Sequence, residues 1–402
     1  MRPVTAAPDT DEQELARWSA AGLDLLTGPA DGPALGPPAG FLARLDALTA
    51  HLRDSARGLG GETDVDPLSE LAVRGELSGH RRRGQVSCGG ACHLVAAADG
   101  WFAVSFARTE DWELVPAWLG IDPRGQSAWG EGAWADSAWG EVHHRCASSP
   151  VRALVERGAA LGLPIGALGE QRDVRPARFT PVGSPLGLSA ARRVSPLRVA
   201  DLSSMWAGPL CGSILAGVGA DVLKVESRSR PDGTRRGSPA LHERLNGAKQ
   251  QVLIDLDRPS GIDELRIILR SVDVVIESSR PRALEHLGIR AEQLLADADG
   301  PTLWVSITGH GRDGANAHRV AFGDDAAVSG GLVSWWQGRP QFCADAVADP
   351  LTGLWAASAA LDALANGGRG LLDVAMSRVA AHFAAGPDGA DGGADGGAGA
   401  PP

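Results

Sequence analysis

An alternation of strand-like and helix-like segments between residues 196 and 378 constrains the fold of this chain more than any other feature. Short runs rich in Val, Ile and Leu recur there, and segments with helical periodicity separate them. The alternation predicts a parallel, doubly wound, Rossmann-like α/β sheet covered by helices. Ligands of such sheets bind beyond the carboxyl ends of the strands, so a site is expected in the loops there. The expected strands are LRVADLS, DVLKVE, QVLIDL, VDVVIES, TLWVSITG and LLDVAM.

The other parts of the chain differ from this domain, which we place at residues 190–385, in pattern and composition. Residues 85–185 predict a smaller α+β domain, placed N-terminal to the large one. Within it, Asp99 and Gly100 stand between two apolar runs, which is a hairpin signal. Residues 386–402 are rich in Gly, Ala, Asp and Pro and cannot bury a core, so a disordered tail is expected.

Length, charge and hydropathy exclude several classes of protein. A chain of 402 residues with 44% hydrophobic content suits two or three globular domains. The net charge of -11 argues against a nucleic-acid or anionic-membrane binder, because both need a broad basic face. No run of eighteen apolar residues occurs and the first residues are polar and acidic, so we expect a cytoplasmic protein.

Three kinds of site signal are considered and disfavoured. The glycines of LAGVGADV close a predicted helix, whereas a dinucleotide fingerprint must open one. No GxSxG elbow occurs, which disfavours a serine hydrolase. Two Cys/His groups lack a paired CxxC, so no metal is predicted. These groups are Cys88, Cys92 and His93, and His143, His144 and Cys146.

The stretch AVADPLTGLW raises the question of what Asp349 does. The residue stands directly before Pro350, where a helix is predicted to begin, and an aspartate there commonly caps the helix. The positive end of the helix dipole also favours an ionised carboxylate. The first free backbone donors would come from Leu351 and Thr352. The residue pattern by itself therefore allows both a capping and a chemical role.

Six stretches in chain order are informative together: VADLSSMWAGPLCGSILAGVGADVLKVE, NGAKQQVLIDLDRPSG, DVVIESSRPRALEHLG, TLWVSITGHGRDG, AAVSGG and ADPLTGLWAA. They resemble the family III CoA-transferases of the CaiB/BaiF type, a group that includes formyl-CoA transferase, the carnitine-CoA transferases and alpha-methylacyl-CoA racemase. The resemblance covers roughly half the chain. It implies that Asp349 is the nucleophile that moves CoA from an acyl-CoA donor to a carboxylic acid acceptor, through an aspartyl mixed anhydride and an aspartyl-CoA thioester.

The resemblance also implies which residues contact the CoA substrate, with no metal involved. Several of the positions given below also have an interpretation without function. Trp206 could be part of the core, Arg228 and Arg235 could be surface charges, and His310 could be an ordinary loop residue. The implied positions are Trp206 beside the CoA cleft, Arg228 and Arg235 near the phosphates, Ser278 and Ser279 at the pantetheine loop, and Thr308, Gly309 and His310 at the loop facing the thioester.

The order of the domains departs from the family. The small domain normally follows the large one, and here it comes first. Residues 1–84 are interpreted as a degenerate helical segment resembling part of the large domain, with Pro37 and Pro38 where Asp349 would stand. We interpret the chain as a permuted, or duplicated and trimmed, member with one complete site. The resemblance implies a homodimer or pairing with a related subunit.

Two alternatives to CoA transfer stay open. Racemases of the family use a histidine and an aspartate as paired bases, and the histidine lies in a Gly-His-Asp segment. The matching segment here is Gly323-Asp324-Asp325, which disfavours a 2-methylacyl-CoA racemase, although Asp324 could act as a base. The second alternative is a non-catalytic or partner-dependent CoA-binding subunit, suggested by the degenerate N-terminal segment.

Overall fold

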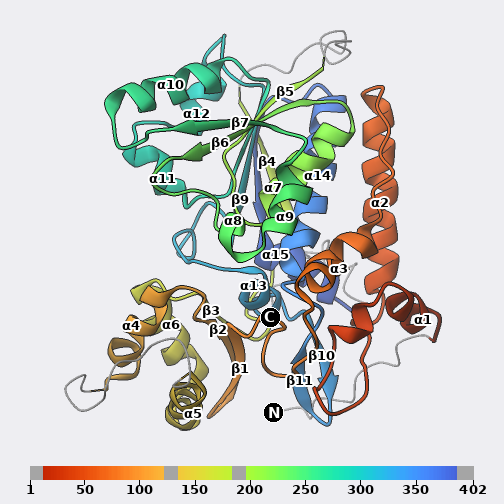
Figure 1. The fold of residues 1–402 in the computed structure, drawn as a ribbon, viewed down its shortest axis with the longest axis vertical. Coiled ribbons are helices and arrows are strands. Elements are labelled where there is room, and N and C mark those ends of the chain that lie inside the picture. The colour runs from red at the N-terminus through yellow and green to blue at the C-terminus, as the bar shows by residue number, and fades with distance from the viewer. Residues whose placement is uncertain (1–11, 122–134, 183–195, 387–402) are drawn as a thin grey trace, which may run out of the picture.

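A computed structural model describes residues 12–121, 135–182 and 196–386 of the chain. The predicted disordered tail, residues 386–402, lies outside these residues except for its first position. Figure 1 shows a large sheet domain in the upper part of the molecule and a smaller domain below it, with N-terminal helices along one side. None of the described helices is long and apolar enough to cross a membrane.

The described residues form one sheet of seven strands in the large domain. They are β4 (Ala177–Pro181), β5 (Arg198–Asp201), β6 (Asp221–Ser227), β7 (Gln250–Ile254), β8 (Val274–Glu277), β9 (Leu303–Thr308) and β12 (Gly370–Ala375). Their order is β4-β12-β9-β8-β5-β6-β7. All neighbours run parallel except β4, which pairs antiparallel with β12 at one edge. The six predicted strands and the α/β fold are confirmed, and β4 is an additional strand.

Helices cover both faces of this sheet. In β8, Val274 and Ile276 join one apolar core and Val275 joins the other, as the alternation of side chains along a strand requires. The sheet is therefore doubly wound, as predicted. The first core includes α7 (Ala207–Gly217), α9 (Pro239–Asn246), α14 (Ala348–Ala365) and α15 (Met376–Ala384), and the second includes α10 (Pro259–Arg270), α11 (Pro281–His286) and α12 (Ala291–Ala296).

A glycine sets how closely two helices of the first core cross. A Cβ on Gly353 in α14 would lie 2.7 Å from the carbonyl oxygen of Ala207 and 2.9 Å from the Cβ of Leu210, both in α7. Only a residue without a side chain permits this approach. The crossing places the first turn of α14 near the start of α7, which follows the loop after β5.

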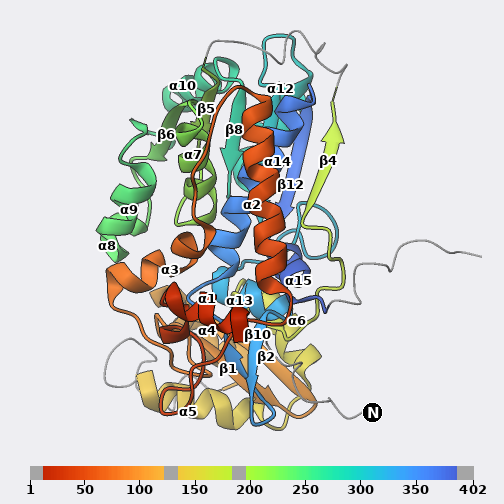
Figure 2. The same ribbon diagram turned by 90° about the vertical axis from the view of Figure 1, so that its right-hand side faces the viewer.

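The N-terminal helices belong to the same core as the large sheet. Trp18, Phe41 and Leu71 are buried in one cluster with residues of α7 and α14. Figure 2 shows the longest of these helices running alongside α14. The segment that the sequence suggests is degenerate is therefore packed as part of the large domain. Its elements are α1 (Glu12–Ala20), the 3-10 helix η1 (Leu23–Leu25), α2 (Phe41–Gly58) and α3 (Pro67–Ser78).

The smaller domain has its own sheet and its own core. The sheet is antiparallel and consists of β1 (Cys92–Ala97), β2 (Gly100–Ser105) and β3 (Ile165–Ala167). Its helices are α4 (Thr109–Leu119), α5 (Ala135–Cys146) and α6 (Val151–Leu161). The hairpin predicted at Asp99-Gly100 is present between β1 and β2. The Asp99 carboxylate also accepts a hydrogen bond of 2.7 Å from the N–H of Val151, which ties the hairpin to α6.

Short elements lie where the two domains meet. They are α13 (Gly323–Ser329) and the hairpin of β10 (Val333–Trp336) and β11 (Arg339–Phe342). A further short helix, α8 (Thr234–Gly237), contacts α9 in the large domain. Helix α13 contacts β2 and β3 of the small domain on one side and α14 and α15 on the other. The hydroxyl of Ser105 in β2 donates a hydrogen bond of 2.9 Å to Asp325 in α13. The start of α13 is thus held where the two domains meet.

Candidate active site

The side chain of Asp349, the second residue of α14, lies against the start of α13. A Cβ on Gly323 would be 2.5 Å from Oδ2 of Asp349 and 2.8 Å from Cβ of Ala346, so glycine permits this close approach. The backbone N–H of Gly323 donates a hydrogen bond to it. Asp349 is half-buried, which leaves part of its side chain accessible to a reactant.

Asp349 does not cap its helix, so the predicted capping role is wrong. Helix α14 begins at Ala348, two residues before the predicted start at Pro350, and Val347 occupies the cap position without a side-chain hydrogen bond. The N–H of Leu351, predicted to be free for the carboxylate, donates to the carbonyl of Val347 at 3.3 Å. The carboxylate of Asp349 is therefore held by a hydrogen bond from α13 and does not cap its own helix.

Two further aspartates share the site with Asp349. Asp324 follows Gly323 in α13, and its Oδ1 accepts a hydrogen bond of 3.0 Å from the N–H of Ala346. Asp345 lies in the turn before α14 and is completely buried. Both are close enough to Asp349 for their charges to affect its pKa. Three carboxylates from two segments therefore converge at one place.

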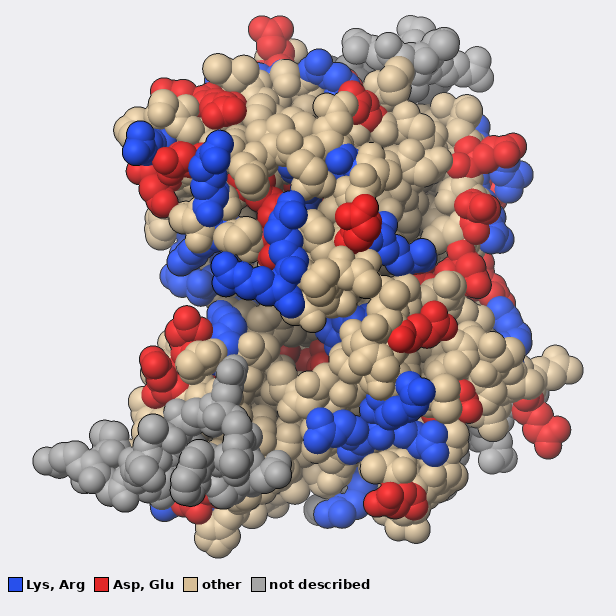
Figure 3. Space-filling view, viewed as in Figure 1, with Lys and Arg blue, Asp and Glu red and all other residues tan. Residues whose placement is uncertain are grey.

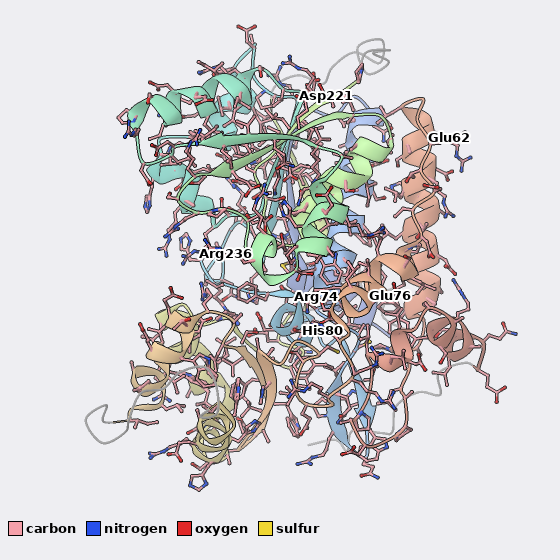
Figure 4. The ribbon with its side chains drawn as sticks, in the orientation of Figure 1. Glu62, Arg74, Glu76, His80, Asp221 and Arg236 are labelled. Carbon is pink, nitrogen blue, oxygen red and sulfur yellow. The ribbon has the colours of Figure 1, made fainter. Side chains whose placement is uncertain are left out.

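Positive charge reaches these carboxylates from the N-terminal segment. Nε of Arg74 in α3 donates to Oδ2 of Asp345 at 2.7 Å, and its Nη2 donates to the other oxygen, so the ion pair is bidentate. Nδ1 of His80 lies 3.0 Å from the same Oδ2. Figure 4 shows Arg74 and His80 side by side near the start of α13, where the upper and lower parts of the molecule meet.

The electrostatics give the three carboxyl groups different pKa values. Burial raises the pKa of Asp349 to about 7, the charge of Arg74 opposes this rise, and Asp324 adds to it. Burial and the charge of Asp345 raise the pKa of Asp324 to about 6. Asp345 is also buried, but the Arg74 ion pair holds its pKa at about 2. Near neutral pH, Asp345 is therefore ionised while Asp349 exchanges a proton.

The turn that carries Asp345 is strained. Ala344 and Ala346 on either side of it have φ angles of 57° and 47°, a region that costs a non-glycine residue about 1–3 kcal/mol. Hydrogen bonds hold both neighbours: the N–H of Ala344 donates to Thr27 at 3.0 Å, and that of Ala346 donates to Asp324. The N-terminal segment and α13 together fix this turn.

Comparison with known proteins identifies the family. The profile of CoA-transferase family III matches residues 194–394, which are half of the chain. The chain belongs to CoA-transferase family III. The predicted family is thereby confirmed, and the matched region contains both Asp324 and Asp349.

Two similar curated proteins have names that agree with this family assignment, and one solved structure is also similar. The chain is 33% identical to a succinate–glutarate CoA-transferase of Agrobacterium fabrum over 189 residues, which are 42% of this chain and 46% of that protein. It is 31% identical to a succinyl-CoA–D-citramalate CoA-transferase of Chloroflexus aurantiacus over 183 residues, 43% of this chain and 45% of that protein. A solved CAIB/BAIF family protein from Brucella suis has 28% identity, covering 49% and 55% of the two chains, with a TM-score of 0.42. This family III chain spans about half the length of the curated relatives it matches.

Trp206, predicted beside the CoA cleft, is buried at the start of α7. The guanidinium carbon of Arg74 lies 5.3 Å from the centre of its ring, within cation–π range. This contact joins the tryptophan to the carboxylate cluster. Its indole N–H has no hydrogen-bond partner among the described residues.

The two loops predicted to contact pantetheine and the thioester lie at strand ends, as expected. Ser278 accepts a hydrogen bond of 3.1 Å from the N–H of Ser204, and the buried hydroxyl of Ser279 lacks a partner among the described residues. In the second loop, Thr308 accepts from Gly311 at 2.9 Å. These hydroxyls sit at the carboxyl ends of β8 and β9.

Gly309 and His310 complete the second loop. A Cβ on Gly309 would lie 2.6 Å from Cβ of Ala321, so the loop packs closely on the residues that lead into α13. Burial lowers the pKa of His310 to about 3, and its Nε2 has no partner in the described part of the chain. A neutral histidine is a poor proton donor near pH 7, which disfavours an acid role.

The two arginines predicted near the phosphates differ. Arg235 is engaged within the protein: its Nη2 lies 2.6 Å from Oε1 of Glu226 and 3.0 Å from Oε1 of Gln251. Arg228 is exposed, and no ion pair found among the described residues includes its side chain. Of the two arginines, Arg228 is therefore more available to bind an anion.

The Cys/His groups considered for a metal serve other contacts. His93 stacks on Trp139 with ring centres 3.6 Å apart, and its Nδ1 lies 3.3 Å from Nε2 of His143. Within the described ranges, no three His, Cys, Asp or Glu side chains are grouped in a way that could hold a metal ion. These histidines belong to the packing of the small domain.

Sequence reasoning misses Arg74, His80 and Asp345. Arg74 and Asp345 are 271 residues apart, and nothing in a single sequence pairs them. The only available signal is weak: Asp345 precedes Asp349 by four residues in DAVADP, so two carboxylates recur close together. The N-terminal pair lies in the segment interpreted as degenerate, where no active-site residue is expected.

Proposed function

We propose that this protein transfers coenzyme A from an acyl-CoA donor to a carboxylic acid, with Asp349 as the nucleophile. The observation that carries the proposal is a half-buried carboxylate in a chain of family III, with a pKa that burial raises to about 7 against the opposing charge of Arg74. The names of the relatives, which are CoA-transferases acting on carboxylic acids, support it.

The chemistry uses one carboxylate twice. An oxygen of Asp349 attacks the thioester carbon, the C–S bond breaks, and CoA thiolate leaves a mixed anhydride. The thiolate attacks the Asp349 carbonyl carbon and releases the donor acid, which leaves an aspartyl-CoA thioester. The acceptor carboxylate then attacks that thioester and expels CoA thiolate. Attack of the thiolate on the acceptor carbonyl frees Asp349, so no net proton or electron is consumed.

The surroundings of Asp349 suit intermediates that water destroys. The nucleophile is only partly exposed, which limits the access of water to an anhydride or thioester. Each attack creates an oxyanion, and donors near it stabilise the transition state. The N–H of Gly323 is one such donor at the Asp349 carboxylate. The charge of Arg74 provides longer-range stabilisation of the same kind.

The first prediction concerns pH. Only ionised Asp349 attacks, so we expect kcat/KM for acyl-CoA to fall as pH drops below about 7. In Asp324→Asn this acid limb should move to lower pH, because the charge of Asp324 raises the pKa of Asp349. Steady-state rates from pH 5 to 9 measure both limbs. A wild-type kcat/KM that stays level down to pH 5, as for an aspartate with its ordinary pKa of about 4, would contradict the assignment.

An open cavity between the two domains offers a place for CoA phosphates. It has a volume of about 910 Å³ and is lined by α6, the β1–β2 turn and the arginine-bearing start of α11. Arg280 and Arg282 line this cavity, and Arg230 lies close enough for its charge to act on Arg280. All three side chains are exposed, and no ion pair among the described side chains includes them. Burial and then the charges of Arg282, Arg108 and Arg230 lower the pKa of Arg280. Figure 3 shows Lys and Arg gathered where the two domains face each other.

The second prediction tests this arginine group. We expect Arg230→Ala with Arg280→Ala to raise KM for acyl-CoA by about tenfold or more and to leave kcat little changed, because charge-assisted contacts to phosphate are lost. The salt dependence of KM should also weaken. Arg57→Ala, which removes an exposed arginine paired with Asp54, is the matched control. An unchanged KM in the double variant would place the phosphates elsewhere.

The donor and acceptor are found by a direct assay. Acyl-CoA donors of short, dicarboxylic and branched acids are paired with a panel of carboxylates, and new acyl-CoA is detected by mass spectrometry. The proposal expects transfer for at least one pair, with no loss of total CoA thioester. Hydrolysis alone for every pair would refute a transferase.

A second candidate function rests on the pairing of Asp324 with Asp349. Two acids with pKa values of about 6 and 7 at one site are suited to removing and returning an α-proton. Heavy water tests this: rapid deuterium uptake at the α-carbon of a 2-methylacyl-CoA without a carboxylate acceptor would favour racemisation over transfer.

A non-catalytic or partner-dependent CoA-binding subunit is the third hypothesis. Such a subunit would still be stabilised by CoA, by about 2.7 kcal/mol at 100 times its dissociation constant, but it would transfer nothing without a partner.

The predicted homodimer or related partner subunit, and the predicted cytoplasmic location, stay predictions. Light scattering with and without CoA measures the oligomeric state.

A further inference from the structure

We propose that Arg74, supplied by the N-terminal segment, is a positioning residue of CoA transfer that fixes the turn before Asp349 and balances the charge of the carboxylate cluster. The inference rests on the proposed function and goes beyond it, because it assigns a role to a segment that the sequence suggests is degenerate. The contacts of one side chain carry the argument.

Arg74 is held ready for this role by its helix. Asp66 caps α3 by accepting a hydrogen bond of 3.1 Å from the N–H of Leu68. Gly79, with a φ of 66°, ends the helix. Arg74 in the last turn but one has a side chain that is 23% exposed and reaches a carboxylate that is fully buried. The direction of α3 thus points a guanidinium into the site.

The bidentate pair anchors the turn that leads into α14. Both carboxylate oxygens of Asp345 accept hydrogen bonds from Arg74, and Oδ2 also contacts His80. This carboxylate therefore binds the N-terminal segment to the turn. The next residue, Ala346, has a positive φ and accepts a hydrogen bond of 2.9 Å from the N–H of Asp349. Displacing Asp345 would therefore displace the nucleophile.

The same guanidinium contacts a third part of the site. It lies over the ring of Trp206, whose position at the start of α7 is predicted to border the CoA cleft. One side chain thus links the turn before Asp349, the loop after β5 and the N-terminal helices. A lysine could supply the charge but not the planar fork or the stacking.

The charge of Arg74 also matters during the reaction. The groups that act on Asp349 are Arg74 from α3, Asp324 from α13 and Asp345 from the turn, and His80 acts on the two other aspartates. Arg74 and His80 are the basic side chains of this set. When Asp349 becomes an anhydride or thioester it loses its charge, and it regains that charge on release. Arg74 keeps the ionised form accessible at neutral pH.

The test compares Arg74→Gln and Arg74→Lys with Arg57→Gln, a charge-removing control in the same segment whose arginine pairs with exposed Asp54. We expect Arg74→Gln to lower kcat by on the order of 100-fold through a misplaced nucleophile. Its acid limb should move up by about 1 pH unit, since a nearby cation favours the carboxylate form. Arg74→Lys should restore the acid limb of the pH–rate profile to its wild-type position more fully than it restores kcat. Arg57→Gln should match the wild type.

A purely structural role gives a different result. Loss of packing alone would lower the melting temperature and the folded fraction but would leave the acid limb of the folded enzyme in place, and that outcome would overturn the inference. If Arg74→Gln fails to fold, the double variant Arg74→Gln with Asp345→Asn removes the unpaired buried charge and keeps hydrogen-bonding groups. Wild-type rate and pH profile in that double variant would also overturn it. A wild-type protein that transfers nothing across the substrate panel refutes the proposed function itself, which is a separate outcome.

Discussion

Asp349→Asn is expected to abolish CoA transfer while the protein still folds and binds CoA. An amide has nearly the shape of the carboxylate but cannot form an anhydride or a thioester. Loss of a nucleophile in other covalent enzymes costs about 10⁴-fold or more in kcat, and we expect a loss of that size. Transfer rates and CoA-dependent stabilisation, measured on the same sample, separate chemistry from binding.

The stability of Asp349→Asn relative to the wild type should depend on pH in a definite direction. The pKa of Asp349 is raised to about 7 in the folded protein, so its stabilising contribution is present at low pH and is lost as pH rises through 7. Asparagine has no such loss, so Asp349→Asn should be at least as stable as the wild type at pH 8. Asp362→Asn is the matched control, since Asp362 lies on the same helix with a 46% exposed side chain. Transfer that survives in Asp349→Asn would refute the proposed nucleophile.

Gly323→Ala is expected to damage both stability and activity. The new Cβ would meet the carbonyl oxygen and the Cβ of Ala346, the latter at 2.8 Å, as well as Oδ2 of Asp349 at 2.5 Å. The carboxylate can rotate away, but the backbone of Ala346 is held by Asp324 and cannot move freely. We expect a loss of about 1–3 kcal/mol in the free energy of unfolding, as for other overpacked sites. Urea unfolding measures it.

The rate should fall more than the stability implies. Moving Asp349 by even a fraction of an ångström changes its approach to the thioester, and a loss on the order of 100-fold in kcat is expected. The control is Gly217→Ala in α7, where an added Cβ would meet nothing within 4 Å. That change should be neutral or slightly stabilising, because alanine is the better helix former. Equal behaviour of the two variants would show that the contact at Gly323 does not constrain the site.

The sequence predicts the large sheet well because its strands are buried on both faces. In VDVVIES the three central residues are apolar in succession, and the structure places these residues, Val274, Val275 and Ile276, in two cores. Strand β4 is not predicted, because ARFTP is mostly exposed at the antiparallel edge and lacks that signal. Local pattern therefore finds central strands and misses an edge.

The candidate site is predictable only where it is local in sequence. The motif around Asp349 is continuous, and the family profile covers it. Its capping role is mispredicted because the helix begins two residues before the predicted start at Pro350, directly after the strained turn at Ala344 and Ala346. Arg74 and His80 cannot be found from local patterns, because only the packing of α2 and α3 on the large domain brings them to Asp345. Single-sequence reasoning holds no information on that contact.

Trapping the acylated enzyme tests the central claim most directly. The protein is incubated with an acyl-CoA that it turns over and with hydroxylamine, which converts an aspartyl anhydride or thioester to a hydroxamate, and its peptides are then sequenced by mass spectrometry. The account predicts a hydroxamate on Asp349, absent without acyl-CoA and absent in Asp349→Asn. Turnover with Asp349 unmodified, or a hydroxamate on another carboxylate such as Asp324, would contradict it.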